Sequence, residues 1–560
     1  MIRYHISYLI PETQFIQIEA QFPSKGLNEI DIKIPAWRPG RYQVQNFAKR
    51  IKGFKVLNEK GDLLRFKKTS KSSWQVESNN VDQITVCYEY HAAIMDAGNS
   101  WLDDEQLYLN FINCIVYTDQ MINEPFEVKF DLPDDYQIAC GLDQPEKHTL
   151  VSPSFYQLVD SPMFASASLR HIQFKNSGID FHIWIQGDLD ISDGQLIDDF
   201  GRYTSKQIEV MEGFPCQEYH YLFQVLPYKH YHGVEHWNST VITLGPHERL
   251  ESREGYLDLL GVSSHELFHT WNVIRLRPKE MTPYRFEGEN YHTTGFITEG
   301  ITTYYGDLFL ARSGTISFNE YMDELNKLLK RHYENEGRKN YSLAESSYDL
   351  WLDGYEKGIP GRKVSIYNEG ALAALILDLS IRLKWKNKKS LDDIIRLMWN
   401  RHGKDLSGYT NEDYQKAAEE VYEGSLDNYF EQIICGTHSY EEYLENLFNE
   451  FGLTFFNCPP TNKEELLYGF KLQDNKVLDI ATDGPAEGKL MLGDIIEKES
   501  LEKVKENIPS ESVLTLDIMR HGRKLVFKLK SSPLEHFSIY QVKHRESNSL
   551  QKGWLEKCIQ

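Results

Sequence analysis

Polar and apolar residues alternate along roughly the first 170 residues of the chain. The alternating segments are rich in β-branched and aromatic residues, and turn residues separate them. A period of two in short, closely spaced segments is typical of antiparallel sheets with one buried face. We therefore expect residues 1–170 to form an N-terminal antiparallel β-sandwich-like domain. Its strands are predicted at residues 3–10, 15–22, 29–34, 83–90, 107–117 and 126–132.

Helical spacing replaces this alternation from about residue 188 onward. A helix at residues 189–213 precedes two predicted strands, one at residues 219–226 and an edge-like strand around residues 234–244. We expect residues 171–455 to form a mostly helical domain with a small edge sheet. Its other helices are predicted at residues 255–272, 298–312, 317–335, 370–384 and 391–402.

The pattern changes again after Pro459 and Pro460, which should interrupt any helix. Strand-like segments return, so residues 456–545 are predicted to form a compact third domain, and residues 546–560 a polar tail. The fold class is therefore multidomain α+β. The strands of the third domain are predicted at residues 468–472, 476–481, 512–520 and 524–530.

Charge and composition exclude several classes of protein. Acidic residues outnumber basic ones 83 to 61, so the net charge of −22 repels nucleic acid. The basic run at residues 382–389 ends an apolar helical pattern, where cations complement the helix dipole. No window approaches 18 uninterrupted apolar residues, and the N-terminus lacks the apolar core of a signal peptide, so no membrane contact is expected.

The seven cysteines are scattered singly and form no C-x-x-C pair. Neither a disulfide framework nor a cysteine-zinc site is therefore expected. A reducing compartment fits this usage, and we expect a cytoplasmic location. The sequence leaves open whether a leader has been removed from the chain.

His265, Glu266 and His269 form an H-E-x-x-H motif within a predicted helix. Side chains four residues apart project from one helix face, so both imidazoles can reach one tetrahedral ion. Glu266 lies beside them, where an ionised carboxylate can take a proton from a metal-bound water. With 19 histidines, chance would produce such a motif in roughly one chain in twenty. The motif therefore needs a second, independent element.

Glu299 supplies that second element. It follows His269 by thirty positions and opens the next predicted helix. A glutamate in the first turn of an adjacent helix can be the third zinc ligand and leave the fourth position to water. The competing interpretation is that Glu299 is simply an acid favoured at this position by the helix dipole. That interpretation is weaker when an H-E-x-x-H helix lies next to it. We expect one Zn²⁺ ion per chain, bound by His265, His269 and Glu299.

Residues 265–278, HELFHTWNVIRLRP, resemble the signature of the glycyl aminopeptidase family of zinc metallopeptidases. The family consists of gluzincins with a thermolysin-like catalytic domain and a C-terminal PDZ domain. Residues 299–305 are similar to its third-ligand helix. Residues 35–42, PAWRPGRY, resemble its Pro-x-Trp-x-Pro-Gly-x-Tyr turn, for which a packing role is favoured, and residues 158–162 resemble the junction before the catalytic domain.

The resemblance also implies substrate-binding residues. Residues 232–236, HGVEH, resemble the family's Gly-Gly-x-Glu-His segment, with His232 in place of the first glycine. Glu235 would bind the α-amino group of the substrate, and Gly233 lies on the strand whose backbone would pair with the peptide. The alternative for Glu235 is an ordinary exposed acid on a strand.

Residues 366–371, IYNEGA, are similar to the family's Tyr-x-Lys-Gly-Ala segment, and Glu369 stands where lysine is usual. The resemblance implies that Tyr367 donates to the oxyanion that develops on the substrate carbonyl. Arg275 and Arg277 follow the zinc motif and could clamp a carboxylate, but a structural role is favoured.

Residues 483–496 look like the Gly-x-Ala…Gly-Asp-x-Ile core of a PDZ domain. Such a domain captures chain ends by strand addition. Because the predicted carboxylate-binding loop at residues 467–470 is a poor match, a structural or self-contact role is equally expected.

Together these features imply a zinc-dependent aminopeptidase that hydrolyses the N-terminal peptide bond of peptides with a free N-terminus. Glu266 would assist attack by a zinc-bound water. The resemblance alone implies a preference for small residues such as glycine and alanine. The alternatives are a zinc peptidase of broader specificity and a non-catalytic interaction protein with a vestigial metal site. The presence of Glu266 disfavours the last, because that residue serves chemistry more than folding.

Overall fold

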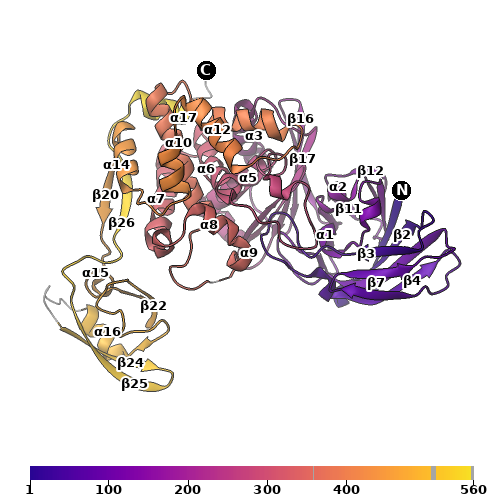
Figure 1. Ribbon diagram of the computed structural model, residues 1–560, viewed down its shortest axis with the longest axis horizontal. Helices are drawn as coiled ribbons and strands as arrows, with labels where there is room; N and C mark the ends of the chain where they lie inside the picture. Colours follow the sequence, from indigo (N-terminus) through magenta and orange to yellow (C-terminus); the bar gives the residue numbers. More distant parts are fainter. Residues whose placement is uncertain (357, 506–512, 557–560) are drawn as a thin grey trace.

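The computed structural model describes residues 1–356, 358–505 and 513–556. Figure 1 shows an N-terminal part built of sheets, a helical part in the middle of the chain, and a small sheet from the C-terminal part that stands apart. The multidomain α+β class predicted from the sequence is confirmed. Among the described helices, none is long and apolar enough to cross a membrane.

The N-terminal part is dominated by a seven-stranded sheet in the order β12-β13-β10-β1-β2-β7-β4. Buried and exposed residues alternate along β1, because successive side chains of a strand point to opposite faces. Two smaller sheets of four and three strands complete this part of the chain. The strands of the large sheet are β1 (Ile2–Ser7), β2 (Phe15–Pro23), β4 (Ile51–Asn58), β7 (Gln83–His91), β10 (Phe126–Phe130), β12 (Asp143–Glu146) and β13 (Thr149–Ser152).

One predicted strand of this part is wrong in its extent. Residues 107–117 contain strand β9 (Gln106–Leu109), which is followed at once by the short helix α1 (Phe111–Cys114). Every residue from 106 to 118 is buried. A continuous buried run has no alternation by which periodicity could separate a strand from a helix.

The helical part carries a five-stranded sheet in the order β15-β16-β17-β19-β18. The single strand predicted around residues 234–244 is in fact a hairpin of β18 (His230–Glu235) and β19 (Ser239–Gly245). The turn closes where the backbone N–H of His236 donates to the carbonyl of Ser239 at 2.9 Å. Strand β18 therefore forms the edge. The other strands are β15 (Arg170–Asn176), β16 (Ile179–Gln186) and β17 (Glu218–Val225).

The helices pack behind this sheet around α10, which is apolar on all sides and almost wholly buried. Helix α10 begins earlier than predicted, so Tyr367 lies in its first turn rather than before it. The main helices are α3 (Asp193–Met211), α5 (Arg253–Phe268), α6 (Thr302–Arg312), α7 (Phe318–Glu334), α10 (Ile366–Trp385), α11 (Leu391–Met398), α12 (Asn411–Tyr422) and α14 (Glu441–Glu450).

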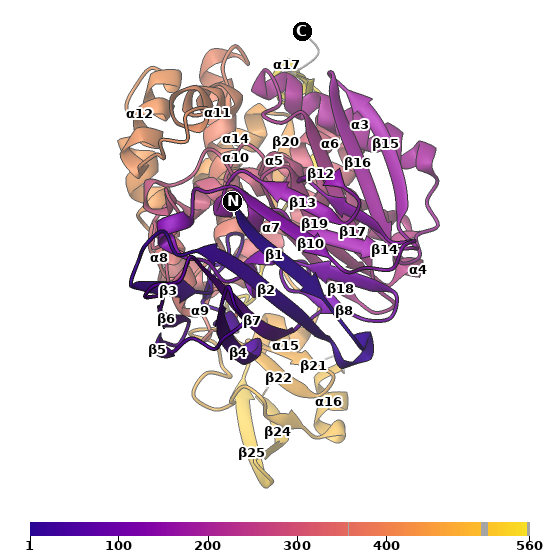
Figure 2. The same ribbon diagram turned by 90° about the vertical axis from the view of Figure 1, so that its right-hand side faces the viewer.

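A five-stranded sheet, β21-β22-β23-β24-β25, forms the third part with helix α16 (Lys498–Lys505). Both views show it apart from the rest of the molecule (Figures 1 and 2). The chain enters and leaves it through an antiparallel pair, β20 (Leu453–Cys458) with β26 (Ile539–His544). The strands are β21 (Phe470–Gln473), β22 (Lys476–Ile480), β23 (Ile495–Ile496), β24 (Val513–Arg520) and β25 (Arg523–Lys530).

The segment predicted as a polar tail contains helix α17 (Ser549–Glu556), which returns to the helical part. Trp554 is fully buried there, and its indole N–H donates to the hydroxyl of Tyr304 on α6 at 2.9 Å. The carbonyl of Trp554 accepts from Arg312 at 3.0 Å. The mostly polar composition of this segment suggested a tail. One buried indole instead anchors the segment to the helical part.

We expect Trp554→Ala to lower the free energy of unfolding by about 3–5 kcal/mol, because it leaves a large cavity in the core. Chemical denaturation followed by circular dichroism measures this. Leu352→Ala, at a position 69% exposed on helix α9 (Leu350–Asp353) of the same part, should change stability by less than about 0.5 kcal/mol. Equal stability of the two variants would contradict the docking of α17.

Candidate metal centre and substrate cleft

Helix α5 carries the H-E-x-x-H motif at its C-terminal end. The helix ends at Phe268, four residues earlier than predicted, yet His269 keeps helical dihedral angles, with φ −58° and ψ −21°. The two rings therefore still lie on one face, and the Nε2 atoms of His265 and His269 are 3.0 Å apart. Glu266 is 4% exposed.

Glu299 approaches both histidines from η5 (Phe296–Ile301), a π-helical turn that leads into α6. Its Oε2 lies 3.8 Å from Nε2 of His265 and 3.4 Å from Nε2 of His269. Zinc bonds of about 2.0–2.1 Å place tetrahedral donors about 3.3 Å from one another. The three donor atoms therefore have the chemistry and the spacing of a zinc site.

Contacts behind the donors orient them. The Nδ1 atom of His269 lies 2.7 Å from the carbonyl oxygen of Asn272, so the ring's proton belongs there and the lone pair of Nε2 faces the donor cluster. Tyr42 donates its hydroxyl proton to Oε1 of Glu299 at 3.0 Å. Asn272 also donates to the carbonyl of Ile297 at 2.8 Å and so fixes the π-helical turn. A packing role is predicted for residues 35–42, and the contact of Tyr42 with Glu299 gives this turn a second role at the site.

Two glycines let η5 and α10 touch. A Cβ atom on Gly300 would lie 2.4 Å from the Cα atom of Gly370, a separation that real Cβ atoms do not show. The backbones can therefore approach only because both side chains are absent. The contact brings Glu299, next to Gly300, and Tyr367, one turn before Gly370, to the same region.

Tyr367 lines a cleft of about 550 Å³ together with His265, Glu266 and Gly233. Burial, followed by the negative charge of Glu299, raises the pKa of Tyr367 well above its usual value, so it remains a protonated donor. The structure thus brings the predicted tyrosine to the predicted metal centre.

Glu369, which stands where lysine is usual in the family, contacts a histidine. Its Oε2 atom lies 2.7 Å from Nδ1 of His332, and both residues are buried. The Glu369 carboxylate therefore has a buried hydrogen-bond partner on α7.

Strand β18 forms the opposite wall of the cleft. The carboxylate of Glu235, which is 5% exposed, lies within 4.8 Å of ligand atoms of Glu266 and His269. It is therefore buried at the site and not an ordinary surface acid. A Cβ atom on Gly233 would lie only 2.3 Å from Oε1 of Glu266, so this position needs glycine.

The predicted junction at residues 158–162 supports the same hairpin. Oδ1 of Asp160 lies 2.9 Å from Nδ1 of His236, and both side chains are largely buried. Gly40, in the turn at residues 35–42, approaches from the other side: a Cβ atom there would lie 2.8 Å from Oε2 of Glu235. Gly40 has φ +73°, a conformation that glycine adopts without strain.

The site holds more negative than positive charge. Burial raises the pKa of Glu266 well above its usual value, and the carboxylates of Glu235 and Glu299 add to the rise. Burial alone would lower the pKa of His269, but Glu299 and Glu235 outweigh it and raise it to about 10. Three buried carboxylates around two imidazoles create a demand for cationic charge, which a divalent ion satisfies.

Arg38 is a buried cation behind these carboxylates. Its role at the site was not predicted from the sequence. It is 1% exposed, and among the described residues its Nε and Nη2 atoms have no hydrogen-bond partner. Gly98 makes room for it, since a Cβ atom there would lie 1.9 Å from Nη2. Its charge opposes the rise in pKa of Glu266, so the N-terminal part contributes to the electrostatics of the site.

The arginines after the motif make contacts within the protein, and a structural role for them stays a prediction. Arg275 is buried and donates to the carbonyls of Trp237 and Thr270, each at 2.9 Å. The guanidinium of Arg277 stacks on the ring of Tyr284 at 3.9 Å. Neither residue lines the catalytic cleft.

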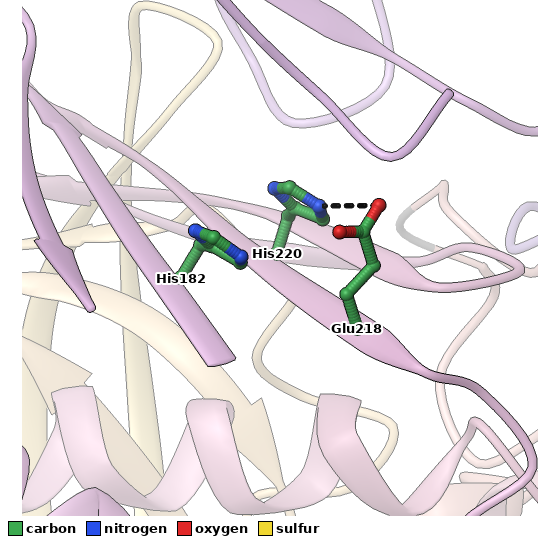
Figure 3. A group of neighbouring side chains, drawn as sticks. All are labelled: His182, Glu218 and His220. Atoms are coloured by element: carbon green, nitrogen blue, oxygen red, sulfur yellow. Dashed lines mark ion pairs between the residues drawn. The ribbon is translucent and has the colours of Figure 1, made fainter. Parts of the chain in front are cut away.

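A second group of potential ligands, His182, Glu218 and His220, lies on β16 and β17 (Figure 3). The two imidazole rings are parallel within 7°, with centroids 4.6 Å apart, so their in-plane lone pairs do not converge on one ion. Trp184 donates to Nδ1 of His220 at 3.2 Å, which leaves the ring proton on Nε2, facing Glu218. This group is a stacked, hydrogen-bonded ladder.

A two-histidine, one-glutamate donor set beside a buried glutamate defines the site of a metallopeptidase. The M61 peptidase N-terminal domain profile matches residues 3–167, and the M61 glycyl aminopeptidase profile matches residues 258–373. The chain belongs to the M61 glycyl aminopeptidase family, as the sequence motifs indicated.

Among solved structures, the chain is similar to an aminopeptidase N family protein from Idiomarina loihiensis. The two share 24% identity with a TM-score of 0.90, over 99% of this chain and 100% of that one. The M1 zinc metallopeptidase from Deinococcus radiodurans is 12% identical, with a TM-score of 0.48 over 78% of this chain and 94% of that one. A comparison with curated proteins finds no match.

We expect Gly300→Ala to weaken zinc binding by about 10- to 100-fold, the range typical when support behind the ligands is lost. The added methyl group must push η5 away from α10 and so move Glu299. Competition with a chromogenic chelator measures the affinity. Gly201→Ala, in α3 with no atom within 4 Å of the added Cβ, is the matched control and should bind zinc normally. Unchanged affinity in Gly300→Ala would refute the role of the glycine contact.

Proposed function

We propose that this chain is a zinc-dependent aminopeptidase that hydrolyses the N-terminal peptide bond of peptides. The observation that carries the proposal is the buried carboxylate of Glu235 beside the cluster of His265, His269 and Glu299. The cluster accounts for hydrolysis. An additional buried carboxylate, on the edge strand of the same site, accounts for recognition of a free α-amino group.

His265, His269 and Glu299 would hold a single zinc ion. When bound, zinc polarises the scissile carbonyl and lowers the pKa of water. Glu266 would act as the general base and return the proton to the leaving amine. Its raised pKa suits a group that both accepts and donates a proton. Its Oε2 atom has no hydrogen-bond partner among the described residues, so it is free for this task.

The peptide would bind along β18, whose outer edge pairs with no other described strand. Strand addition to this edge, with Gly233 in the pairing segment, would align the scissile bond with Glu266. The turn at Gly40 closes the groove next to Glu235, which would exclude residues before the N-terminal one. Tyr367 would donate to the oxyanion from the opposite wall.

The family's description as glycyl aminopeptidases supports a preference for small N-terminal residues, glycine or alanine. The alternative with broader specificity uses the same residues and differs only in the substrates accepted. The complete set of Glu266, Tyr367 and the three ligands disfavours a non-catalytic interaction protein.

The proposed domain division remains residues 1–170, 171–455 and 456–545, with α17 assigned to the thermolysin-like catalytic domain. The sheet β21–β25 with α16 would be a PDZ-like module. It would contact a peptide or a second copy of the chain.

We expect Glu266→Gln to retain zinc and to lose about 10²- to 10⁴-fold in kcat, the usual contribution of general acid–base catalysis. Elemental analysis measures the zinc, and hydrolysis of glycyl and alanyl p-nitroanilides measures the activity. A wild-type protein that remains metal-free and inactive in excess zinc would overturn the proposed function, as would full activity in Glu266→Gln.

Glu235→Gln should lower kcat/KM for peptides with a free N-terminus by at least about 30-fold, mainly through KM, since it removes a buried charge pair. Zinc content should not change. N-acetylated peptides are the matched control, because they cannot form this pair and should be hydrolysed equally poorly by both proteins. A wild-type enzyme that cleaves acetylated and free peptides equally well would contradict the role of Glu235.

A further inference from the structure

The cleft extends well beyond the metal centre. From His265 and Glu266 it runs along β18 to Asp258 on α5, Asp307 on α6 and Glu324 on α7. Helices α5 and α6 meet closely along it, since a Cβ atom on Gly306 would lie 3.3 Å from Cβ of His265. The cleft therefore has room for more of a bound peptide than the part that contacts the catalytic residues.

Its direction follows from β18. Glu235 is the last residue of that strand and His230 is the first, and the cleft is lined by residues 229–233. A peptide with its amine at Glu235 and its reactive carbonyl beside Glu266 must continue toward His230. The far part of the cleft therefore receives the residues that follow the scissile bond, an inference that rests on the proposed function.

Two of the three acids in this part already have partners. Asp258 pairs with Arg249, and Glu324 accepts from Lys327 at 2.7 Å. Asp307 forms no ion pair and no side-chain hydrogen bond with any residue that the structure describes. It differs from its neighbours in this respect.

The position of Asp307 fixes what it can reach. Its Oδ1 atom lies 3.7 Å from where Gly261 would carry a Cβ atom, and both residues line the cleft. Gly261 precedes His265 by four residues, which is about 6 Å along the helix axis. Asp307 thus stands about one helical turn beyond the metal centre, on the leaving-group side.

Burial and the nearby acids disfavour the ionised form of the Asp307 carboxylate, and the positive charge around it does not compensate for them. Burial, followed by Glu324 and Asp258, raises the pKa of Asp307 to about 7, although Lys327 and Arg331 oppose the rise. A cation placed against Asp307 would restore its ionised form and gain a charge-assisted hydrogen bond in a largely enclosed site.

We propose that Asp307 binds the positively charged side chain of the residue that follows the scissile bond, so that the enzyme favours peptides with lysine or arginine at the second position. The opposite polarity is tested in the same experiment. Arg331 is exposed at the edge of the cleft and would instead favour an acidic residue, if it dominated.

The test compares glycyl tripeptides that differ only at the second residue, with lysine, norleucine or glutamate there. For the wild-type holoenzyme we expect kcat/KM for lysine to exceed that for norleucine by about tenfold, the effect of one charge-assisted contact. In Asp307→Asn this ratio should fall to about one, and in Asp198→Asn, an exposed acid on α3, it should stay at the wild-type value. Equal rates for lysine and norleucine in the wild type, or a lysine preference that survives in Asp307→Asn, would overturn the proposal.

Calorimetric binding of the same peptides to zinc-loaded Glu266→Gln separates this proposal from the proposed function. That variant measures recognition without turnover, so the lysine preference should appear as tighter binding and should vanish in Glu266→Gln/Asp307→Asn. Tighter binding of the lysine peptide by an enzyme that hydrolyses nothing would leave the Asp307 site standing and refute only the aminopeptidase activity. Tighter binding of the glutamate peptide would assign the cleft to Arg331 and refute Asp307.

Discussion

The rest of the structure depends on one constraint, which is the burial of several carboxylates around two imidazoles. Carboxylates of Glu235, Glu266 and Glu299 lie together in a largely enclosed site, where each would be costly without compensation. A divalent cation between His265, His269 and Glu299 would supply that compensation. Burial, together with the carboxylates of Glu235 and Glu299, raises the pKa of Glu266 above its usual value.

Holding this arrangement requires segments from distant parts of the chain. The π-helical turn η5 and the first turn of α10 meet through the contact of Gly300 with Gly370, which has no room for a side chain. Helix α5 packs against α6, where Gly306 lies close to His265. The N-terminal part contributes Tyr42 to Glu299 and the buried charge of Arg38. The N-terminal, sheet-rich part is thus a component of the site and not only a neighbour of the helical part.

The sequence predicts the grouping of His265, His269 and Glu299, because two histidines four residues apart share one helix face and a glutamate in the next helix can reach them. It also predicts the succession of sheet-rich, helical and again sheet-rich segments. It could not separate β18 from β19, because the tight turn between them lies within a run of buried residues. Tyr42 and Arg38 were overlooked for a different reason. Tyr42 contacts Glu299, 257 residues away along the chain, and Arg38 acts on Glu266 through its charge. No local pattern in the sequence records such interactions. Nothing in the local sequence distinguishes Asp307 from other acids on helices. Its position in the cleft is apparent only in the folded structure.

The return of α17 to the helical part has a consequence for how the protein is made. Trp554 is buried in the core beside Tyr304, on the helix that follows the Glu299 turn. The small sheet β21–β25 is synthesised before α17, so the helical part is discontinuous along the chain. During translation α17 is therefore synthesised only after the small sheet. The helical part can complete its core around Trp554 only once the chain has passed through that sheet.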